Sequence, residues 1–285
     1  MQATAFVPGH VTGFFSAHPA EDPTEAGSRG AGLALTDGVG VTVEPADGKT
    51  AVVLEDAGGD RQRMSPGSID AVETVLETLE LDAGVRLEID ADLPLGAGFG
   101  VSGAMALGTA LAANAAFDRR LSENELVTIA HAADVRAGTG LGDVVAQARG
   151  GVPIRLEPGA PAVNSIDAVP ARARVEYVTF GERSTADVLA GETDRLTEAG
   201  KRALSRVVSE PTLSSVIHAS RRFAREADLL TPEAREAIEA VAAEGGQASM
   251  AMLGDTAFAV GTGLTDAGYD PAVCAIDPAG ATLEG

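Results

Sequence analysis

Residues 85–104 read VRLEIDADLPLGAGFGVSGA, and this stretch decides the fold. Residues 85–89 alternate apolar and polar side chains, as a half-buried strand does. Pro94 and the glycines that follow it end that alternation. Over residues 101–117, small and apolar residues recur at helical spacing. The stretch therefore predicts a strand, a glycine-rich loop and a helix in succession.

A glycine loop between a strand and a helix suits phosphate groups. Glycine lets backbone N–H groups approach a ligand closely, and the helix N-terminus adds the positive end of a dipole. The Walker A pattern is one form of such a loop. It fails here, because Gly48, Lys49 and Thr50 supply its ending but position 43, which must be glycine, is Val43.

A dinucleotide-binding fingerprint is the second alternative. Residues 98–103 match G-x-G-x-x-G, and the acidic Glu123 follows about twenty residues later. That fingerprint belongs in the first βα turn of an alternating βαβ array. Mostly strand-type sequence precedes it here, which disfavours a dinucleotide fold.

The rest of the chain predicts a mixture of strands and helices in two lobes. Ser122 and Glu125 form a capping box at the start of one helix. Residues 157–169 contain prolines and no period, which indicates a connection, so the domains are expected at 1–160 and 170–285. The predicted strands are 5–7, 11–15, 32–35, 39–43, 52–54, 85–89, 150–156, 175–180, 248–253, 256–261 and 272–276. The predicted helices are 68–81, 101–117, 122 to about 134–138, 193–209, 212–229 and 232–243.

The glycine loop resembles the phosphate loop P-x-G-x-G-L-G-S-S-A-A of the GHMP kinase superfamily. It departs from that pattern at Val101 and Gly103, whereas Ser102 keeps the second serine. Residues 6–16 occupy the place of the family's first motif, with His10 where several relatives have lysine. Residues 249–258 match the third motif, which packs on the phosphate loop. With the segments 28–32 and 139–144, the chain resembles the archaeal pantoate kinases over residues 5–260.

This resemblance implies an α+β, two-lobe GHMP kinase fold. Its N-terminal domain would be like domain 2 of ribosomal protein S5, and its C-terminal domain would be the GHMP α+β domain. It also implies an enzyme that uses ATP and Mg²⁺ to phosphorylate (R)-pantoate to 4-phosphopantoate in archaeal coenzyme A biosynthesis. The residues then expected to bind the nucleotide are Pro94, Gly96, Ala97, Gly98, Phe99, Gly100, Val101, Ser102 and Gly103.

The catalytic roles carried over from the family fall on Asp143, Ser102 and Asp134. Asp143 would orient or deprotonate the acceptor hydroxyl. Ser102 and Asp134 offer the hard oxygen atoms that Mg²⁺ prefers, although relatives usually have Glu at the second position. In a chain with 42 acidic residues, an ordinary solvated carboxylate is the alternative for each aspartate.

Four residues are candidates for binding the acceptor. Arg155 lies in an apolar strand, where a charge is costly unless it is paired or faces a cleft. Its guanidinium fits the pantoate carboxylate, and an arginine reaching out from an edge strand is the alternative. Arg29 and Ser28 lie in a glycine-rich segment, where an ordinary loop arginine is the alternative. The resemblance favours a substrate contact for His131, against a core histidine.

Composition limits the remaining partners. The formal charge of −21 disfavours nucleic acid, and together with only two lysines it resembles proteins of salt-loving archaea. One cysteine excludes an internal disulfide and favours a reduced cytoplasm. No apolar stretch reaches the ~20 residues of a membrane span. A homodimer is a family-level expectation. Two alternative functions stay open: a kinase for mevalonate, homoserine or shikimate, and a non-catalytic nucleotide-binding sensor.

Overall fold

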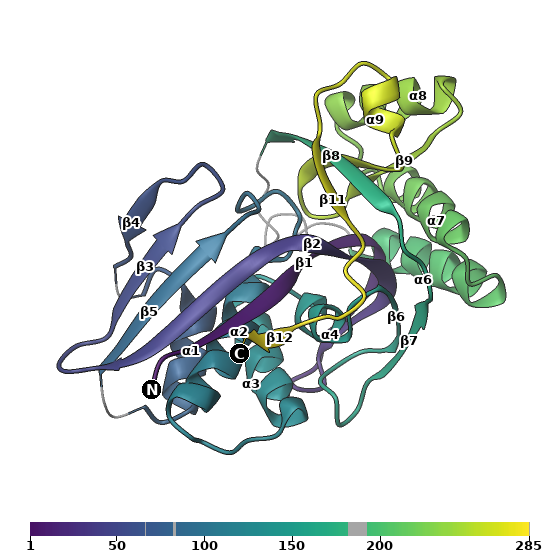
Figure 1. Cartoon of the computed structure of the whole chain (residues 1–285). Helices are drawn as coiled ribbons and strands as arrows, with labels where there is room; N and C mark the ends of the chain where they lie inside the picture. Colours follow the sequence, from purple (N-terminus) through teal and green to yellow (C-terminus); the bar gives the residue numbers. More distant parts are fainter. Residues whose placement is uncertain (66, 82–83, 182–192, 285) are drawn as a thin grey trace.

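Two β-sheets and the helices packed on them make up the computed structural model, which describes residues 1–65, 67–81, 84–181 and 193–284 (Figure 1). The larger sheet has the order β12-β1-β2-β5-β3-β4, and β6 joins β2 and carries β7. The smaller sheet has the order β11-β8-β10-β9. The expected α+β fold is confirmed.

The elements before residue 170 are β1 (Ala3–His18), β2 (Gly27–Ala46), β3 (Ala51–Glu55), β4 (Arg61–Arg63), α1 (Asp70–Thr78), β5 (Gly84–Ala91), α2 (Val101–Ala116), α3 (Glu123–Ala137), α4 (Asp143–Arg149), β6 (Val152–Glu157) and β7 (Ser165–Val169). Those after it are β8 (Arg174–Gly181), α6 (Thr193–Ser209), α7 (Leu213–Glu226), α8 (Pro232–Ala243), β9 (Gln247–Ala251), β10 (Asp255–Val260), α9 (Gly263–Asp266), β11 (Ala272–Ala275) and β12 (Thr282–Glu284).

β1 and β2 form one long antiparallel hairpin. The sequence predicted two short strands within each of them. The break in each strand corresponds to one shift in the pairing register, between Pro8 and Gly9, which pair with Gly38 and Leu35. A second shift, between Thr12 and Phe14, lies inside the predicted strand 11–15. The prolines and glycines therefore mark β-bulges within continuous strands, and not strand ends.

Helix α2 is the centre of the first lobe. It is buried on nearly every side, since it packs on β1 and β2 and also contacts α1 and α3. A helix that is apolar all round needs such an enclosed position. Gly108 allows close approach to the sheet, because a Cβ there would lie 2.5 Å from Cγ2 of Val41. The start of α2, and with it the glycine loop, is thereby fixed above the sheet.

The chain after α2 is partly as predicted. The Ser122 capping box is confirmed, with the Glu125 N–H bonded to the Ser122 side chain and the Glu125 carboxylate bonded to the Ser122 N–H. α3 ends at Ala137 and is capped by Gly138, which has a φ of 69°. Helix α4 was not predicted, and Asp143 is its first residue, not part of the glycine-rich turn before it.

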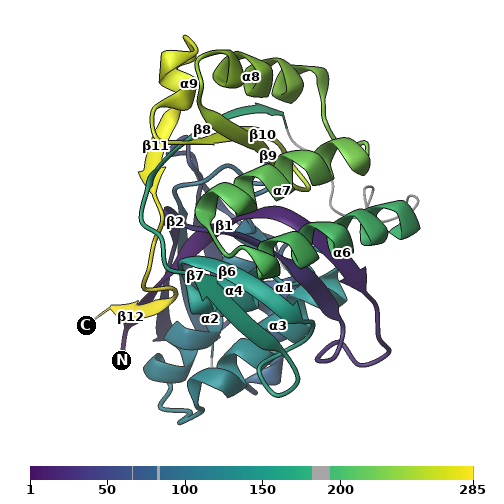
Figure 2. The same ribbon diagram turned by 90° about the vertical axis from the view of Figure 1, so that its right-hand side faces the viewer.

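The second lobe packs against the far end of β1. α6 and α7 lie together across that strand, and α7 and α8 cover the smaller sheet (Figure 2). Phe15 of β1 and Phe223 of α7 have ring centroids 5.8 Å apart. The three predicted helices of this lobe are confirmed as α6, α7 and α8.

Three strands lie where the sequence indicated none, and the first of them is β4, which pairs antiparallel with β3. The predicted connection over residues 157–169 contains β7, which pairs antiparallel with β6. At the other end of the chain, β12 pairs with β1, from Thr4 with Glu284 to Phe6 with Thr282. The larger sheet therefore takes strands from both ends of the described chain, and in both views the two termini lie close together (Figures 1 and 2).

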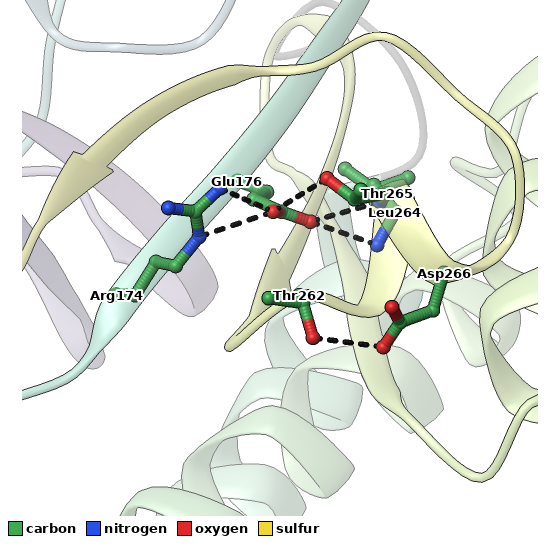
Figure 3. Close-up of polar contacts among 6 residues, drawn as sticks. All are labelled: Arg174, Glu176, Thr262, Leu264, Thr265 and Asp266. Atoms are coloured by element: carbon green, nitrogen blue, oxygen red, sulfur yellow. Dashed lines mark hydrogen bonds and ion pairs between the residues drawn. The ribbon is translucent and has the colours of Figure 1, made fainter.

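A buried carboxylate ties the smaller sheet to α9. Glu176 of β8 has no solvent exposure and accepts two hydrogen bonds from the guanidinium of Arg174 (Figure 3). The N–H groups of Leu264 and Thr265 and the Thr265 hydroxyl donate to it as well, at 2.8–3.0 Å. Burial alone would raise the pKa of Glu176, but these donors hold it below its usual value. Beside it, the Thr262 hydroxyl donates to Asp266.

Helices that could cross a membrane, judged by length and apolar character, are absent from the part of the chain that the structure describes.

Candidate active site

A cavity of about 590 Å³ opens in front of the glycine loop, and small-molecule sites have about this volume. Six of the nine loop residues predicted to bind nucleotide line it: Gly96, Gly98, Phe99, Gly100, Val101 and Ser102. Pro94, Ala97 and Gly103 do not. The structure thus brings most of the predicted loop to one cavity, together with Asp143.

The opposite wall of this cavity was not predicted. Leu54, Met64 and Ile69 give it an apolar surface, and Gln62 and Ser68 add polar groups. These residues come from β3, β4 and the segment before α1. They belong to no motif, so only the pairing of β3 with β5 and β4 brings them to the glycine loop.

The loop backbone has a shape that glycine permits. Gly96, Gly98 and Gly100 have φ values of 70°, 92° and 64°, in the left-handed region that L side chains rarely adopt. Gly100 is also the N-cap of α2. The first-turn N–H groups of this sixteen-residue helix therefore begin at the cavity, where they can bind an anion.

The second lobe supports the loop from behind. Gly254 lies so close that a Cβ there would be 2.0 Å from the Ala97 carbonyl oxygen, to which the Thr256 hydroxyl donates at 2.8 Å. Phe99 packs edge-on against Tyr177 of β8, with centroids 4.8 Å apart. The predicted packing of residues 249–258 on the loop is confirmed.

Asp143 is held by groups from β1. His10 Nδ1 lies 2.7 Å from Oδ1 of Asp143, and the Thr12 hydroxyl donates to the same oxygen at 3.1 Å. Burial would raise the pKa of Asp143, but the bond to His10, the charge of Arg155 and the Thr12 hydroxyl lower it below its usual range. The carboxylate is therefore ionised, and it can accept a hydrogen bond from an alcohol.

Ser102 and Asp134 are linked through Thr139. The Ser102 hydroxyl donates to Thr139 at 2.9 Å, and the Thr139 hydroxyl donates to Oδ1 of Asp134 at 2.6 Å. Burial raises the pKa of Asp134 to about 7. The hydroxyl groups of Thr139 and Ser102 lower this pKa, but their effect is smaller than that of burial. Gly140 and Gly103 make room for this carboxylate, because a Cβ on either would approach its Oδ2. The departure from the family pattern at Gly103 therefore fits the local packing.

These oxygen atoms suit Mg²⁺, a hard cation that takes one or two protein carboxylates together with phosphate oxygens. Ser102 lines the cavity and Asp134 lies directly behind it, so the donors fit such an ion. Clusters of three or more His, Cys, Asp or Glu side chains that could hold a metal are absent from the described ranges. Ligands for Mg²⁺ beyond these two side chains would have to come from the substrate and water.

Arg155 is a buried cation without a hydrogen-bonded partner among the described residues. It is 2% exposed, and within the described part of the chain its Nε and Nη1 atoms bond to nothing. Its strand, β6, is paired on both sides, so the alternative of an arginine reaching out from an edge strand is wrong. Burial lowers the pKa of Arg155 and the Asp143 charge opposes that shift. An unpaired, buried guanidinium is a strong site for an anion.

Ser28 converges with Arg155 on the residue before Asp143. A Cβ on Gly142 would lie 2.7 Å from Oγ of Ser28 and 3.0 Å from Nε of Arg155. Ser28 is buried at the start of β2. The structure therefore brings Ser28 and Arg155 together beside Asp143.

The other two predicted substrate residues make contacts within the protein. His131 is buried, and its Nε2 lies 2.9 Å from the Ala26 carbonyl oxygen, so it holds the chain just before Ser28. Arg29 forms an ion pair with Glu157 at the surface. None of the four predicted substrate residues, Ser28 and Arg155 included, lines the cavity.

Gln147 is a further polar residue at this site. It is fully buried on α4, one turn after Asp143, and its Nε2 donates to the Gly100 carbonyl oxygen at 2.9 Å. A glutamine in a short alanine-rich helix gives no signal in the sequence. The structure shows that α4 connects the aspartate to the glycine loop.

Comparison with known proteins gives matches along nearly the whole chain. The family model described as GHMP kinases N terminal domain matches residues 68–151. The pantoate kinase of Methanospirillum hungatei is 32% identical over 91% of this chain and 88% of its own. That of Thermococcus kodakarensis is 33% identical, with the same coverage of both chains. A solved structure described as a phosphotransferase related to the CoA biosynthesis pathway is 28% identical, with a TM-score of 0.88 over 100% of this chain and 99% of its own.

Proposed function

This chain belongs to the pantoate kinases of the GHMP kinase family, and from this premise we propose how its cavity phosphorylates (R)-pantoate to 4-phosphopantoate. It is an ATP-dependent small-molecule kinase. Phosphoryl transfer requires positioning and charge stabilisation more than covalent chemistry by the protein. We therefore assign each part of the site to the ligand group that its side chains and backbone can bind.

ATP binds with its triphosphate on the glycine loop. The left-handed glycines and the start of α2 present backbone N–H groups there. The base and ribose then lie toward Leu54, Met64 and Ile69, where the cavity wall is apolar. A bound Mg²⁺ would be held by Ser102 and Asp134, and it supplies charge neutralisation at the phosphates.

Pantoate binds on the opposite side of Asp143. Its carboxylate pairs with Arg155, Ser28 donates to it or to a hydroxyl, and His131 keeps Ser28 in place through Ala26. Arg29 is proposed to close over the acceptor. The 4-hydroxyl then faces Asp143. The unpaired guanidinium of Arg155 beside the ionised Asp143 is the single observation that best supports this acceptor.

In the transfer step, the 4-hydroxyl oxygen forms a bond to the γ-phosphorus while the bond from that phosphorus to the β,γ-bridging oxygen breaks. Asp143 accepts the hydroxyl proton, and ADP leaves with the electron pair of the broken bond. The loop N–H groups stabilise charge on the phosphate oxygens. The proton passes from Asp143 to solvent after the products leave.

The surrounding biology is proposed from composition and family. We propose a cytoplasmic protein of a salt-rich cell, in accord with its single cysteine and its charge of −21. A homodimer is the family-level assembly. The division into domains 1–160 and 170–285 is also kept as a proposal, with β12 returning to the first sheet.

The test is ADP release in molar KCl with ATP and Mg²⁺, comparing pantoate with mevalonate, homoserine, shikimate and no acceptor. We expect release that depends on pantoate, together with a phosphorylated product. Release with another acceptor would keep the kinase and replace the Arg155 pocket. ATP binding without release on any acceptor would support the nucleotide-binding sensor.

A further inference from the structure

His10 contacts both the catalytic carboxylate and the glycine loop. Its ring Nδ1 lies 2.7 Å from Oδ1 of Asp143, and its backbone N–H donates to the Phe99 carbonyl oxygen at 2.8 Å. Asp143 and Phe99 belong to different elements, far from His10 in the sequence. One residue of β1 therefore touches the two parts of the site that must meet during phosphoryl transfer.

The two carboxylate oxygens of Asp143 differ in their hydrogen bonds. Oδ1 accepts from both His10 and the Thr12 hydroxyl. Within residues 1–65, 67–81, 84–181 and 193–284, Oδ2 accepts no hydrogen bond. The side chain is 16% exposed and lines the cavity. With Oδ1 saturated by the protein, Oδ2 is the oxygen left for a substrate hydroxyl.

The His10 ring is locked in one orientation. It is fully buried, and a Cβ on Gly32 would lie 2.4 Å from its Nε2. Nε2 has no hydrogen-bond partner in the described ranges. Burial lowers the pKa of His10, against the effect of Asp143, and this favours the neutral ring. A neutral ring that bonds an ionised carboxylate must carry its hydrogen on Nδ1.

We propose that His10 is a positioning residue for the phosphoryl transfer: its Nδ1–H holds Oδ1 of Asp143 so that Oδ2 faces the acceptor hydroxyl, while its backbone fixes the glycine loop. This inference rests on the proposed function. It explains how the distance between the proton acceptor and the phosphates is set before substrate binds. The energetic gain is one of orientation, since His10 itself touches no reacting atom.

Three substitutions separate donor geometry from packing. In His10→Asn the amide nitrogen takes roughly the place of Nδ1, whereas in His10→Gln it extends toward the place of Nε2. His10→Leu removes the donor. We expect kcat within a few-fold of wild type for His10→Asn and at least about tenfold lower for the other two, with the KM for ATP and for pantoate nearly unchanged. His218→Ala, on the surface of α7, is the matched control.

The pH dependence of kcat gives a readout that packing alone would not move. Asp143 faces Arg155 from β6, Asp134 from α3 and the Thr12 hydroxyl from β1, besides His10. These groups stay in every variant. Loss of the Nδ1–H donor must then move the acid limb of the kcat profile to higher pH in His10→Gln and His10→Leu, but not in His10→Asn.

A measurement on the unmodified protein covers the case in which the variants do not fold. The ¹⁵N couplings of the four histidine rings identify the tautomer of each, and His10 is expected to carry its hydrogen on Nδ1. A hydrogen on Nε2 overturns the proposal, as does an unchanged kcat and acid limb in folded His10→Leu. Failure of the wild-type protein to phosphorylate pantoate contradicts the proposed function instead, and it is seen before any variant is made.

Discussion

Gly254 and Ala97 meet backbone to backbone, with no side chain between them. A Cβ on Gly254 would lie 2.0 Å from the carbonyl oxygen of Ala97 and 2.1 Å from its carbonyl carbon. Contacts that short do not occur, so any side chain at residue 254 must displace the glycine loop. The second lobe thus helps to fix the position of the glycine loop.

Gly254→Ala is therefore expected to weaken ATP binding. Overpacking of this kind costs about 1–3 kcal/mol, which corresponds to an affinity roughly fivefold to a hundredfold lower. Isothermal titration with ATP measures it. Gly40→Ala is the matched control, because a Cβ at residue 40 has its nearest neighbours at 3.9 Å. Equal ATP affinity in the two variants would show that the loop is not fixed by this contact.

Asp143→Asn is expected to lower kcat by at least about a hundredfold while ATP binding is retained. The amide still fits between His10 and the cavity, but it does not accept the proton of the acceptor hydroxyl. Single-turnover ADP release and ATP titration check the two halves of this statement. Asp266→Asn, on α9, is the control. Near-normal turnover would remove the catalytic role of Asp143.

Arg155→Met is expected to raise the KM for pantoate at least about tenfold without destabilising the fold. Arg155 is buried without a hydrogen-bonded partner in the described chain, so an apolar side chain of similar length removes a desolvation cost. Acceptor kinetics and urea unfolding measure the two effects. Arg86→Met is the control, because that side chain is exposed on β5. An unchanged KM would assign Arg155 to structure alone.

Glu176→Gln is expected to lower the free energy of unfolding by about 1–2 kcal/mol at pH 7. The amide N–H₂ would replace one carboxylate oxygen, and the N–H groups that donate to that oxygen would lose their acceptor. The folded-state pKa of Glu176 lies below its ordinary value of 4.5. Its ionised form therefore stabilises the fold above that pH, and the stabilisation is lost as pH falls through the folded-state pKa.

Urea unfolding of wild type and Glu176→Gln in molar salt, at pH 7 and below pH 4, tests the sign of this pH dependence. The difference between the two proteins is expected to shrink on acidification. Glu239→Gln, exposed on α8, provides the control. A difference that grows at low pH would mean that the folded-state pKa of Glu176 lies above its ordinary value.

The melting temperature is expected to rise with salt. With a formal charge of −21, self-repulsion acts over a Debye length of about 10 Å at 0.1 M salt but about 3 Å at 1 M. Thermal unfolding followed by circular dichroism in 0.1 M and molar KCl measures it. A melting temperature independent of KCl would contradict the proposed adaptation to a salt-rich cell.

Local signals explain what could be predicted from the sequence. The capping box at Ser122 and Glu125 depends on residues three apart, and the glycine loop on a run of neighbours, so both are visible without a structure. Arg155 was found because a charge in an apolar strand is unusual. What could not be seen is that this guanidinium lacks a hydrogen-bonded partner among the described residues, since that depends on every surrounding element.

Other features have no local signal. Helix α4 is seven residues long and follows three spaced glycines, so its period is too short to distinguish it from a turn. The bond between His10 and Asp143 joins residues 133 apart. β7 and β12 are short and depend on pairing with strands that already exist. In each case long-range contacts, not local propensity, decide the structure.

The pairing of β12 with β1 also has a consequence for synthesis on the ribosome. Strand β1 emerges long before residues 282–284, its partner on one side. Until then one edge of β1 offers unpaired N–H and C=O groups, which can template association with other chains. We therefore expect the first sheet to be completed only after residues 282–284 have left the ribosome, and expression at a slower translation rate to lengthen the period of vulnerability to aggregation.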